Sequence, residues 1–136
     1  MGLAERRQIA SADAGLEEAL AELRAHLGFD IEMEVDKSSF PEDKTVMDCY
    51  EYYKDYSFPM VAKVLTQVAR DDMGKEAVKE SIRKVVIINT ATDKDNGGAK
   101  EMTLHDGVLT VKQGWYGYSD ILFGEQELLQ QVESAL

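Results

Sequence analysis

An eight-residue stretch, Phe29–Asp36, alternates strictly between apolar and acidic residues and constrains the fold more than any other part of this sequence. Successive side chains of a β-strand point to opposite faces, so a strand here buries one set and displays the other as a row of charge. The apolar set is Phe29, Ile31, Met33 and Val35, and the acidic set is Asp30, Glu32, Glu34 and Asp36. The pattern therefore predicts a strand at the boundary between core and solvent.

A stripe of leucines predicts an amphipathic helix immediately before this strand. The leucines recur at the three- and four-residue intervals of one helix face: Leu16, Leu20, Leu23 and Leu27. Asp13 is a suitable N-cap, and Gly28 stands where a left-handed C-terminal cap is expected. We therefore expect residues 1–12 to form a flexible N-terminal tail and residues 13–136 to form a single domain.

Helical signals also fill the middle of the chain. Ser39 and Glu42 have the spacing of a capping box and precede a tyrosine-rich segment that we expect to be helical. The segment Ser57–Pro59 indicates a break, after which a longer helix begins. Gly74 should kink that helix or divide it in two. Its buried face is expected to carry Val61, Val64, Leu65 and Val68.

The C-terminal half reads as three strands and a closing helix. Val85–Asn89 begins with four apolar β-branched residues, which is typical of a central strand covered on both sides. Asp106 and Gly107 stand between two strand-like segments and predict a hairpin, because both central turn residues require positive φ. The closing helix is expected to bury Leu128, Leu129, Val132 and Leu136.

These elements give the order α-β-α-α-β-β-β-α and predict the α+β class. We expect one small, mainly antiparallel sheet with helices packed on one of its faces.

Negative charge dominates the chain and limits its partners. The formal net charge is −11 over 136 residues, and Gly28–Tyr56 carries nine carboxylates against three lysines. Binding to nucleic acid or to an anionic membrane requires a basic patch, so neither is expected. A basic protein partner is favoured instead, although an acidic surface can also serve solubility alone. A single cysteine and no apolar run of membrane-spanning length indicate a soluble, cytoplasmic protein.

The sequence contains no complete motif for catalysis or metal binding. The loop Asp93–Gly98 begins like a calcium loop, but its twelfth position is Leu104 where a bidentate carboxylate is required. His26 and His105 lack partners at ligand spacing, and acidic neighbours should keep the Cys49 thiol unreactive. We expect the protein to hold no cofactor and no metal. A binding protein is favoured over an enzyme.

Aromatic residues accompany the acid. Tyr50 and Tyr53 should face the core, while Tyr52 and Tyr56 should form a more exposed helix face. Tyrosine and tryptophan are enriched at the energetic centres of protein interfaces. We therefore expect a protein partner to contact Asp30, Glu32, Glu34, Asp36, Asp48, Glu51, Tyr52, Asp55, Tyr56, Trp115, Tyr116 and Tyr118.

The leading hypothesis is a small, non-enzymatic, acidic interaction protein of bacterial type that binds a basic protein. Immunity proteins and secretion chaperones are analogous in size, charge and α+β class, although two helices after the first strand depart from the common secretion-chaperone arrangement. The second hypothesis is an enzyme or small-ligand-binding domain with a pocket between sheet and helices. The third is a subunit of a homodimer or a larger homo-oligomer.

Overall fold

One mixed sheet of four strands forms a layer of the molecule within residues 2–41, 46–91, 99–114 and 122–136, which the computed structural model describes. The strands are β1 (Glu32–Asp36), β2 (Lys84–Asn89), β3 (Glu101–His105) and β4 (Val108–Gln113). Their order across the sheet is β1-β2-β4-β3. β1, β2 and β4 run parallel, and β3 alone is antiparallel to its neighbour. β1 and β3 are therefore the two edges of the sheet.

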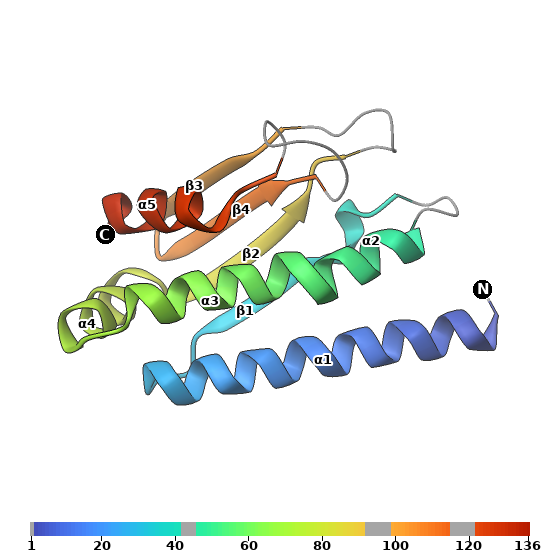
Figure 1. The fold of residues 1–136 in the computed structure, drawn as a ribbon, viewed down its shortest axis with the longest axis horizontal. Coiled ribbons are helices and arrows are strands. Elements are labelled where there is room, and N and C mark those ends of the chain that lie inside the picture. The colour runs from blue at the N-terminus through green and yellow to red at the C-terminus, as the bar shows by residue number, and fades with distance from the viewer. Residues whose placement is uncertain (1, 42–45, 92–98, 115–121) are drawn as a thin grey trace.

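The helices lie together on one face of this sheet (Figure 1). They are α1 (Leu3–Leu27), α2 (Val46–Tyr52), α3 (Phe58–Val68), α4 (Asp72–Ser81) and α5 (Glu125–Ala135). A short 3-10 helix, η1 (Lys37–Ser39), follows β1, and a π-helical turn, η2 (Tyr53–Ser57), joins α2 to α3. α1 runs along the β1 side of the molecule, and α5 covers the β3 and β4 side (Figure 1).

The α+β class and the element order agree with the sequence prediction, but the prediction of a mainly antiparallel sheet is wrong. The helices between β1 and β2 carry the chain back to the end from which β1 started, and such a crossover makes the two strands parallel. In the hairpin, β4 rather than β3 pairs with β2. β4 buries Leu109 and Val111, whereas alternate residues of β3 are exposed, so β3 suits the edge.

Side chains of the central strands alternate between a buried face and an open face. Val85 and Ile87 of β2 are fully buried beneath the helices. Val86 and Ile88, on the opposite face, are only half-buried. We expected this strand to be covered on both sides, but the helices within the described residues cover only one face of the sheet. The stripe of α3 is as predicted, with Val61, Val64, Leu65 and Val68 buried.

Helix α1 is longer than the sequence indicates. It begins at Leu3, so the predicted start at Asp13 is wrong, and residues 3–12 have a helical backbone where we expected a tail. Most side chains of this first part are exposed, but Ala12 is buried. The carboxylate of Asp13 does not cap the helix. It forms an ion pair with the ammonium group of Lys37 instead, with 2.7 Å between Nζ and Oδ1.

The local turn signals of the sequence are confirmed. Gly28 has φ 81° and caps α1 with a hydrogen bond from its N–H to the Arg24 carbonyl at 2.9 Å. Asp106 and Gly107 have φ 51° and 79°, as the predicted hairpin turn requires.

The predicted break at Ser57–Pro59 does not exist. Ser57 and Phe58 keep helical dihedral angles, and the Phe58 N–H bonds to the Tyr53 carbonyl across a π turn. The extra residue of the π turn accommodates Pro59, which has no N–H to continue an ordinary ladder.

The long helical region is divided in two, but Gly74 is not the point of division. α3 ends at Val68, and Asp71 then caps α4 by accepting a hydrogen bond from the Gly74 N–H at 2.8 Å. Gly74 lies in the first turn of α4 and packs directly against the carboxyl end of α3. The capping role predicted for Ser39 involves Glu42, which lies outside the described residues.

Candidate functional site

The acidic row on β1 lies where the sequence pattern placed it. Met33 is buried and Val35 half-buried, while Glu32 and Glu34 are exposed and Asp36 is half-buried. Asp30 is exposed in the turn that precedes the strand. The register of β1 is therefore as predicted, and its carboxylates stand at the surface along one edge of the sheet.

A groove of about 540 Å³ lies between α1 and this edge strand. Five apolar side chains from α1, β1 and the start of α3 line it: Leu16, Leu20, Met33, Val35 and Phe58. Its charged lining residues are Asp13, Glu17, Glu34, Asp36 and Lys37. We call this feature the α1–β1 groove. Four carboxylates against one lysine make it strongly acidic.

Ion pairs neutralise only part of that charge. Lys37 pairs with Asp13 at 2.7 Å, and Lys84 of β2 pairs with Glu34 at 3.1 Å. The Asp36 carboxylate accepts hydrogen bonds from the backbone and hydroxyl of Ser38, which hold it at the end of the strand. All these groups are in contact with solvent, so the pairs contribute little to stability and can exchange partners.

The acidic residues of α2 and η2 form a second surface next to α1. Asp48, Glu51 and Asp55 are exposed, and Tyr52 stacks on Tyr56 with ring centroids 5.7 Å apart. Tyr56 is 66% exposed, as the sequence predicted, whereas Tyr52 is half-buried against the core, so the pair presents chiefly the Tyr56 ring to solvent. The predicted contact residues Trp115, Tyr116 and Tyr118 lie outside the described residues.

Lys37 connects the groove to this second surface. Its ammonium group lies 5.9 Å from the centroid of the Tyr50 ring while it pairs with Asp13. Tyr50 and Glu51 also line a smaller hollow of about 210 Å³ between α1 and α2. The structure thus brings two of the predicted acidic groups, those of β1 and of α2, to neighbouring sides of α1.

Cys49 is buried in the core beneath this surface. Its side chain is fully inaccessible, and burial raises the pKa of its thiol to about 12. The sequence prediction of an unreactive thiol stands, but the cause is desolvation rather than the acidic neighbours we named.

We expect the Cys49 thiol to resist a soluble disulfide reagent at about pH 8 in the native protein, because both burial and the raised pKa keep it from forming a thiolate. It should react completely in concentrated guanidinium chloride. Absorbance of the released chromophore measures both states. Rapid reaction of the native protein would show that the α2 region opens readily.

Neither histidine forms part of a metal-binding arrangement in the described part of the chain, where no cluster of three or more ligand side chains is found. His26 hydrogen-bonds to the Ala69 carbonyl at 3.0 Å and ties α1 to α3. His105 is exposed and lies 3.1 Å from the carboxylate of its neighbour Asp106. The calcium-like loop Asp93–Gly98 lies outside the described residues. Before it, β2 ends at Asn89, and after it, β3 begins at Glu101.

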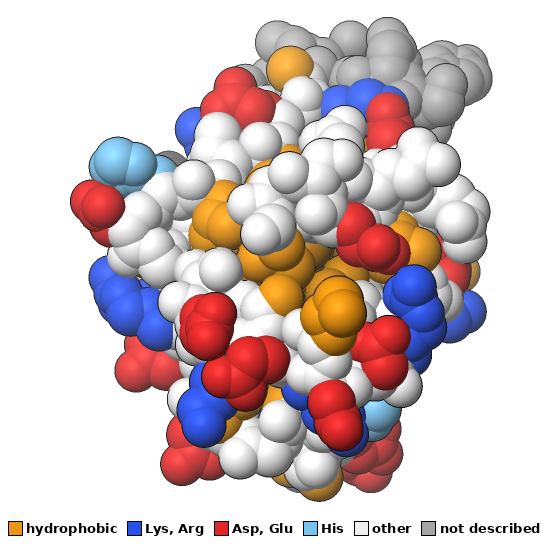
Figure 2. All heavy atoms as spheres, turned by 90° about the vertical axis from the view of Figure 1, so that its left-hand side faces the viewer, with side chains coloured by type: hydrophobic (Ala, Val, Ile, Leu, Met, Phe, Trp, Pro, Cys, Tyr) orange, Lys and Arg blue, Asp and Glu red, His pale blue; other side chains and the backbone are white. Residues whose placement is uncertain are grey.

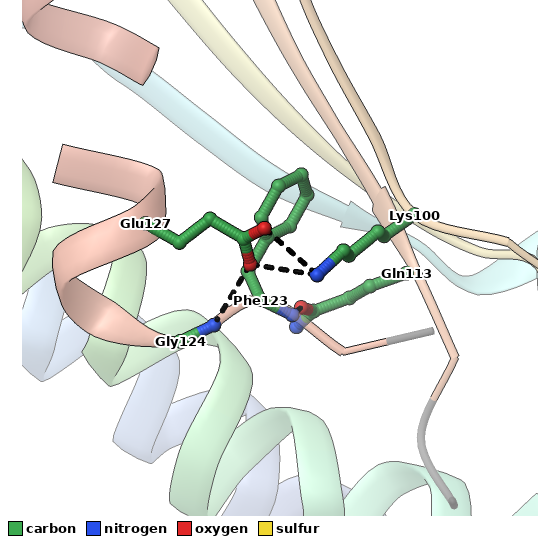
Figure 3. A network of polar contacts seen from close by, with 5 residues as sticks. All are labelled: Lys100, Gln113, Phe123, Gly124 and Glu127. Carbon is green, nitrogen blue, oxygen red and sulfur yellow. Dashed lines mark hydrogen bonds and ion pairs between the residues drawn. The ribbon is translucent and has the colours of Figure 1, made fainter. Parts of the chain in front are cut away.

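Sequence reasoning missed a polar network near the edge of the sheet that lies farthest from β1. Lys100 binds both carboxylate oxygens of Glu127, at 2.7 and 2.8 Å, and lies 5.6 Å from the Phe123 ring centroid (Figure 3). These contacts lower the pKa of Glu127, chiefly through the hydrogen bonds from Lys100. The Phe123 N–H donates to the Gln113 side chain at 3.0 Å. The network joins β4 to the start of α5.

Gln113 anchors this network in the core. Its side chain is fully buried and donates to the Ser57 hydroxyl at 2.8 Å, while the backbone carbonyl of Gln113 accepts from the Tyr53 hydroxyl at 3.0 Å. No sequence signal marks these partners, because they are more than fifty residues apart. Every polar group of the Gln113 side chain that faces the core has a partner, so we assign the network a structural role.

Charge is distributed differently at the end of the molecule where α4 and the C-terminus lie. Figure 2 shows lysines and arginines interspersed with acidic residues around a central apolar hollow. Lys63 of α3 pairs with Glu125 of α5 at 3.2 Å, and Arg70, in the turn after α3, pairs with Glu133 of α5 at 3.7 Å. The excess of acid is therefore not uniform over the surface.

Comparisons with known protein families, with characterised proteins and with solved structures found no match. Among the described helices, none combines the length and apolar character that a membrane crossing requires.

Proposed function

We propose that this chain is an acidic interaction protein that binds a basic protein partner through the α1–β1 groove and the adjoining acidic surface of α2. The observation that carries the proposal is the groove itself, in which an apolar floor is surrounded by four carboxylates. Immunity proteins and secretion chaperones are classes that this activity fits, by analogy of size, charge and fold class alone. We place the activity in the bacterial cytoplasm.

The composition of the groove supports binding as well as solubility. Carboxylates that serve solubility alone need no apolar surface between them, whereas Leu16, Leu20 and Met33 provide one here. Apolar contact provides affinity when water is removed from it. The surrounding charge speeds association and discriminates against acidic proteins. The stacked pair Tyr52 and Tyr56 adds rings on which lysine and arginine side chains can rest.

The described carboxylates stand at the surface, and the buried polar side chains of the described residues are Ser57, Asn89 and Gln113. This distribution favours contact with a partner over acid–base catalysis, because a catalytic carboxyl group needs a desolvated setting to shift its pKa. Binding of a partner is therefore the function that the geometry supports best.

Reversing two charges on β1 should weaken binding without unfolding the protein. We expect the double variant Glu32→Lys/Glu34→Lys to bind the co-purifying native partner about tenfold or more weakly, because both side chains are exposed beside the groove. Its thermal midpoint should stay close to that of the parent. Titration calorimetry at several salt concentrations measures affinity, and circular dichroism measures stability.

The matched control places the same charge change on α4. Glu76 and Glu80 are exposed at the end with mixed charge, so Glu76→Lys/Glu80→Lys changes the net charge equally and should alter affinity by no more than about twofold. Equal weakening by both variants would mean that only net charge matters. A neutral or acidic partner, or salt-insensitive binding, would contradict the proposal.

A further inference from the structure

The backbone of β1 points open hydrogen-bonding groups away from the sheet. The Glu32 N–H donates to the Arg83 carbonyl at 3.1 Å, so Glu32, Glu34 and Asp36 direct their backbone groups toward β2. In a parallel ladder the residues between them, Met33 and Val35, direct theirs to the other side. β1 is an edge strand, so that other side has no neighbouring strand in the described sheet.

Helix α1 covers the beginning of this edge but not its middle. The Arg24 guanidinium donates to the Ile31 carbonyl at 2.8 Å and thereby satisfies the first outward-facing group. Within the described residues, no hydrogen bond satisfies the outward groups of Met33 and Val35. Two N–H and two C=O groups are thus available to a partner along about 7 Å of strand.

The open edge and the α1–β1 groove are the same place. Met33 and Val35 line the groove with their side chains while their backbone groups face outward beside it. α1 forms the opposite wall through Leu16 and Leu20 (Figure 1 shows α1 running along this side of the sheet). A strand laid against β1 would therefore contact α1 with the side chains that it directs toward the helical layer.

The acidic residues around this edge determine which kind of segment can bind there as a strand. Glu32 and Glu34 flank the edge on the open face of the sheet, and Asp13 and Glu17 flank it on α1. A second copy pairing through β1 would set these glutamates against their equivalents, and like charges directly opposite are destabilising. A segment that alternates basic and apolar residues matches both the carboxylates and the groove.

We propose that a basic segment of the partner binds as a fifth strand along β1, with alternate apolar side chains in the α1–β1 groove. The inference rests on the proposed function and specifies its mode of recognition, β-strand addition. Main-chain hydrogen bonds to Met33 and Val35 hold the segment. Its basic side chains, on the other face of the extended sheet, lie beside Glu32 and Glu34.

A seven-residue peptide of alternating lysine and valine, acetylated and amidated at its ends, is the probe. Amide hydrogen exchange of the full chain, followed by NMR, should show fast exchange at Met33 and Val35 without peptide. Peptide should slow both amides about tenfold or more. The amides of Glu34 and Asp36 already face β2, so they should be protected before peptide is added and should gain less protection than those of Met33 and Val35. The same peptide with glutamate in place of lysine should not bind.

Two N-methylated peptides separate strand addition from simple charge attraction. One carries the methyl groups on its valines and the other on its internal lysines, so each blocks the backbone donors of one edge only. One should bind about tenfold or more weakly and the other within about threefold of the parent peptide, because only one edge can face β1. Which peptide loses affinity reports whether the added strand is parallel or antiparallel.

Three results of the peptide experiments would overturn strand addition. They are equal affinity of the two methylated peptides, unchanged exchange at Met33 and Val35, or no binding of the parent peptide at millimolar concentration. Protection of both amides in a dimer of the free protein would also overturn it, because a second copy would then occupy the edge. The charge-reversal comparison with the native partner decides the proposed function separately.

Discussion

Alanine at position 74 should destabilise the protein by about 3 kcal/mol or more, because there is no room for a single methyl group. A Cβ at Gly74 would lie 1.8 Å from the Val68 carbonyl oxygen and 2.8 Å from its carbon. These are backbone atoms at the end of α3, so α4 would have to move away from α3. Urea unfolding followed by circular dichroism measures the free energy of unfolding of Gly74→Ala.

Gly15 provides the matched control for this substitution. It lies within α1, and a Cβ there would meet only the Lys54 side chain, at 3.8 and 3.9 Å. Gly15→Ala should therefore stabilise the protein by about 0.5–1 kcal/mol, since alanine is the better helix former. The same chemical change thus has opposite signs at two helical positions. Gly74→Ala with parental stability would disprove the close approach of α4 to α3.

Removing the amide of Gln113 should be the second most damaging change. Methionine has nearly the same length but can neither accept from the Phe123 N–H nor donate to the Ser57 hydroxyl, both of which are bonded to this side chain. Each buried group left without a partner costs about 1–3 kcal/mol. We expect Gln113→Met to lower the free energy of unfolding by about 2–4 kcal/mol.

The position of the change can be tested as well as its size. Gln131→Met makes the same replacement at an exposed site of α5 and should alter stability by less than about 0.5 kcal/mol. Because Phe123 directly precedes α5, amide exchange in the first turn of this helix should accelerate in Gln113→Met. If Gln113→Met is as stable as the parent protein, water must satisfy the Ser57 hydroxyl and the Phe123 N–H in place of the lost amide.

Local patterns in the sequence predicted local structure well. The alternation in Phe29–Asp36, the cap at Gly28 and the hairpin turn at Asp106 and Gly107 each depend on a few adjacent residues, and each is confirmed. The acidic row on β1 could be predicted because a strand with one buried face has only one possible register. The stacking of Tyr52 on Tyr56 likewise follows from their spacing on a helix.

Features that depend on distant residues could not be predicted. Nothing near β1 indicates that it pairs in parallel with β2, since a run of alternating residues is equally compatible with either direction. The wall of the groove includes Leu16 and Leu20 of α1, which the sequence placed on an apolar helix face without indicating that this face lies beside β1. Gln113 looks like an ordinary strand residue until Tyr53 and Ser57 are placed beside it.

The pairing of β1 with β2 alone also bears on the order in which the protein assembles. β3 and β4 meet across a two-residue turn, whereas the pairing of Glu32 with Lys84 closes a long segment that contains α2, α3 and α4. Contacts between residues distant in sequence form slowly, because the loop-closure entropy precedes any gain. β1 is therefore expected to dock last during folding and to detach first during partial unfolding. A partner strand bound along β1 would then slow that detachment and lengthen the lifetime of the native state.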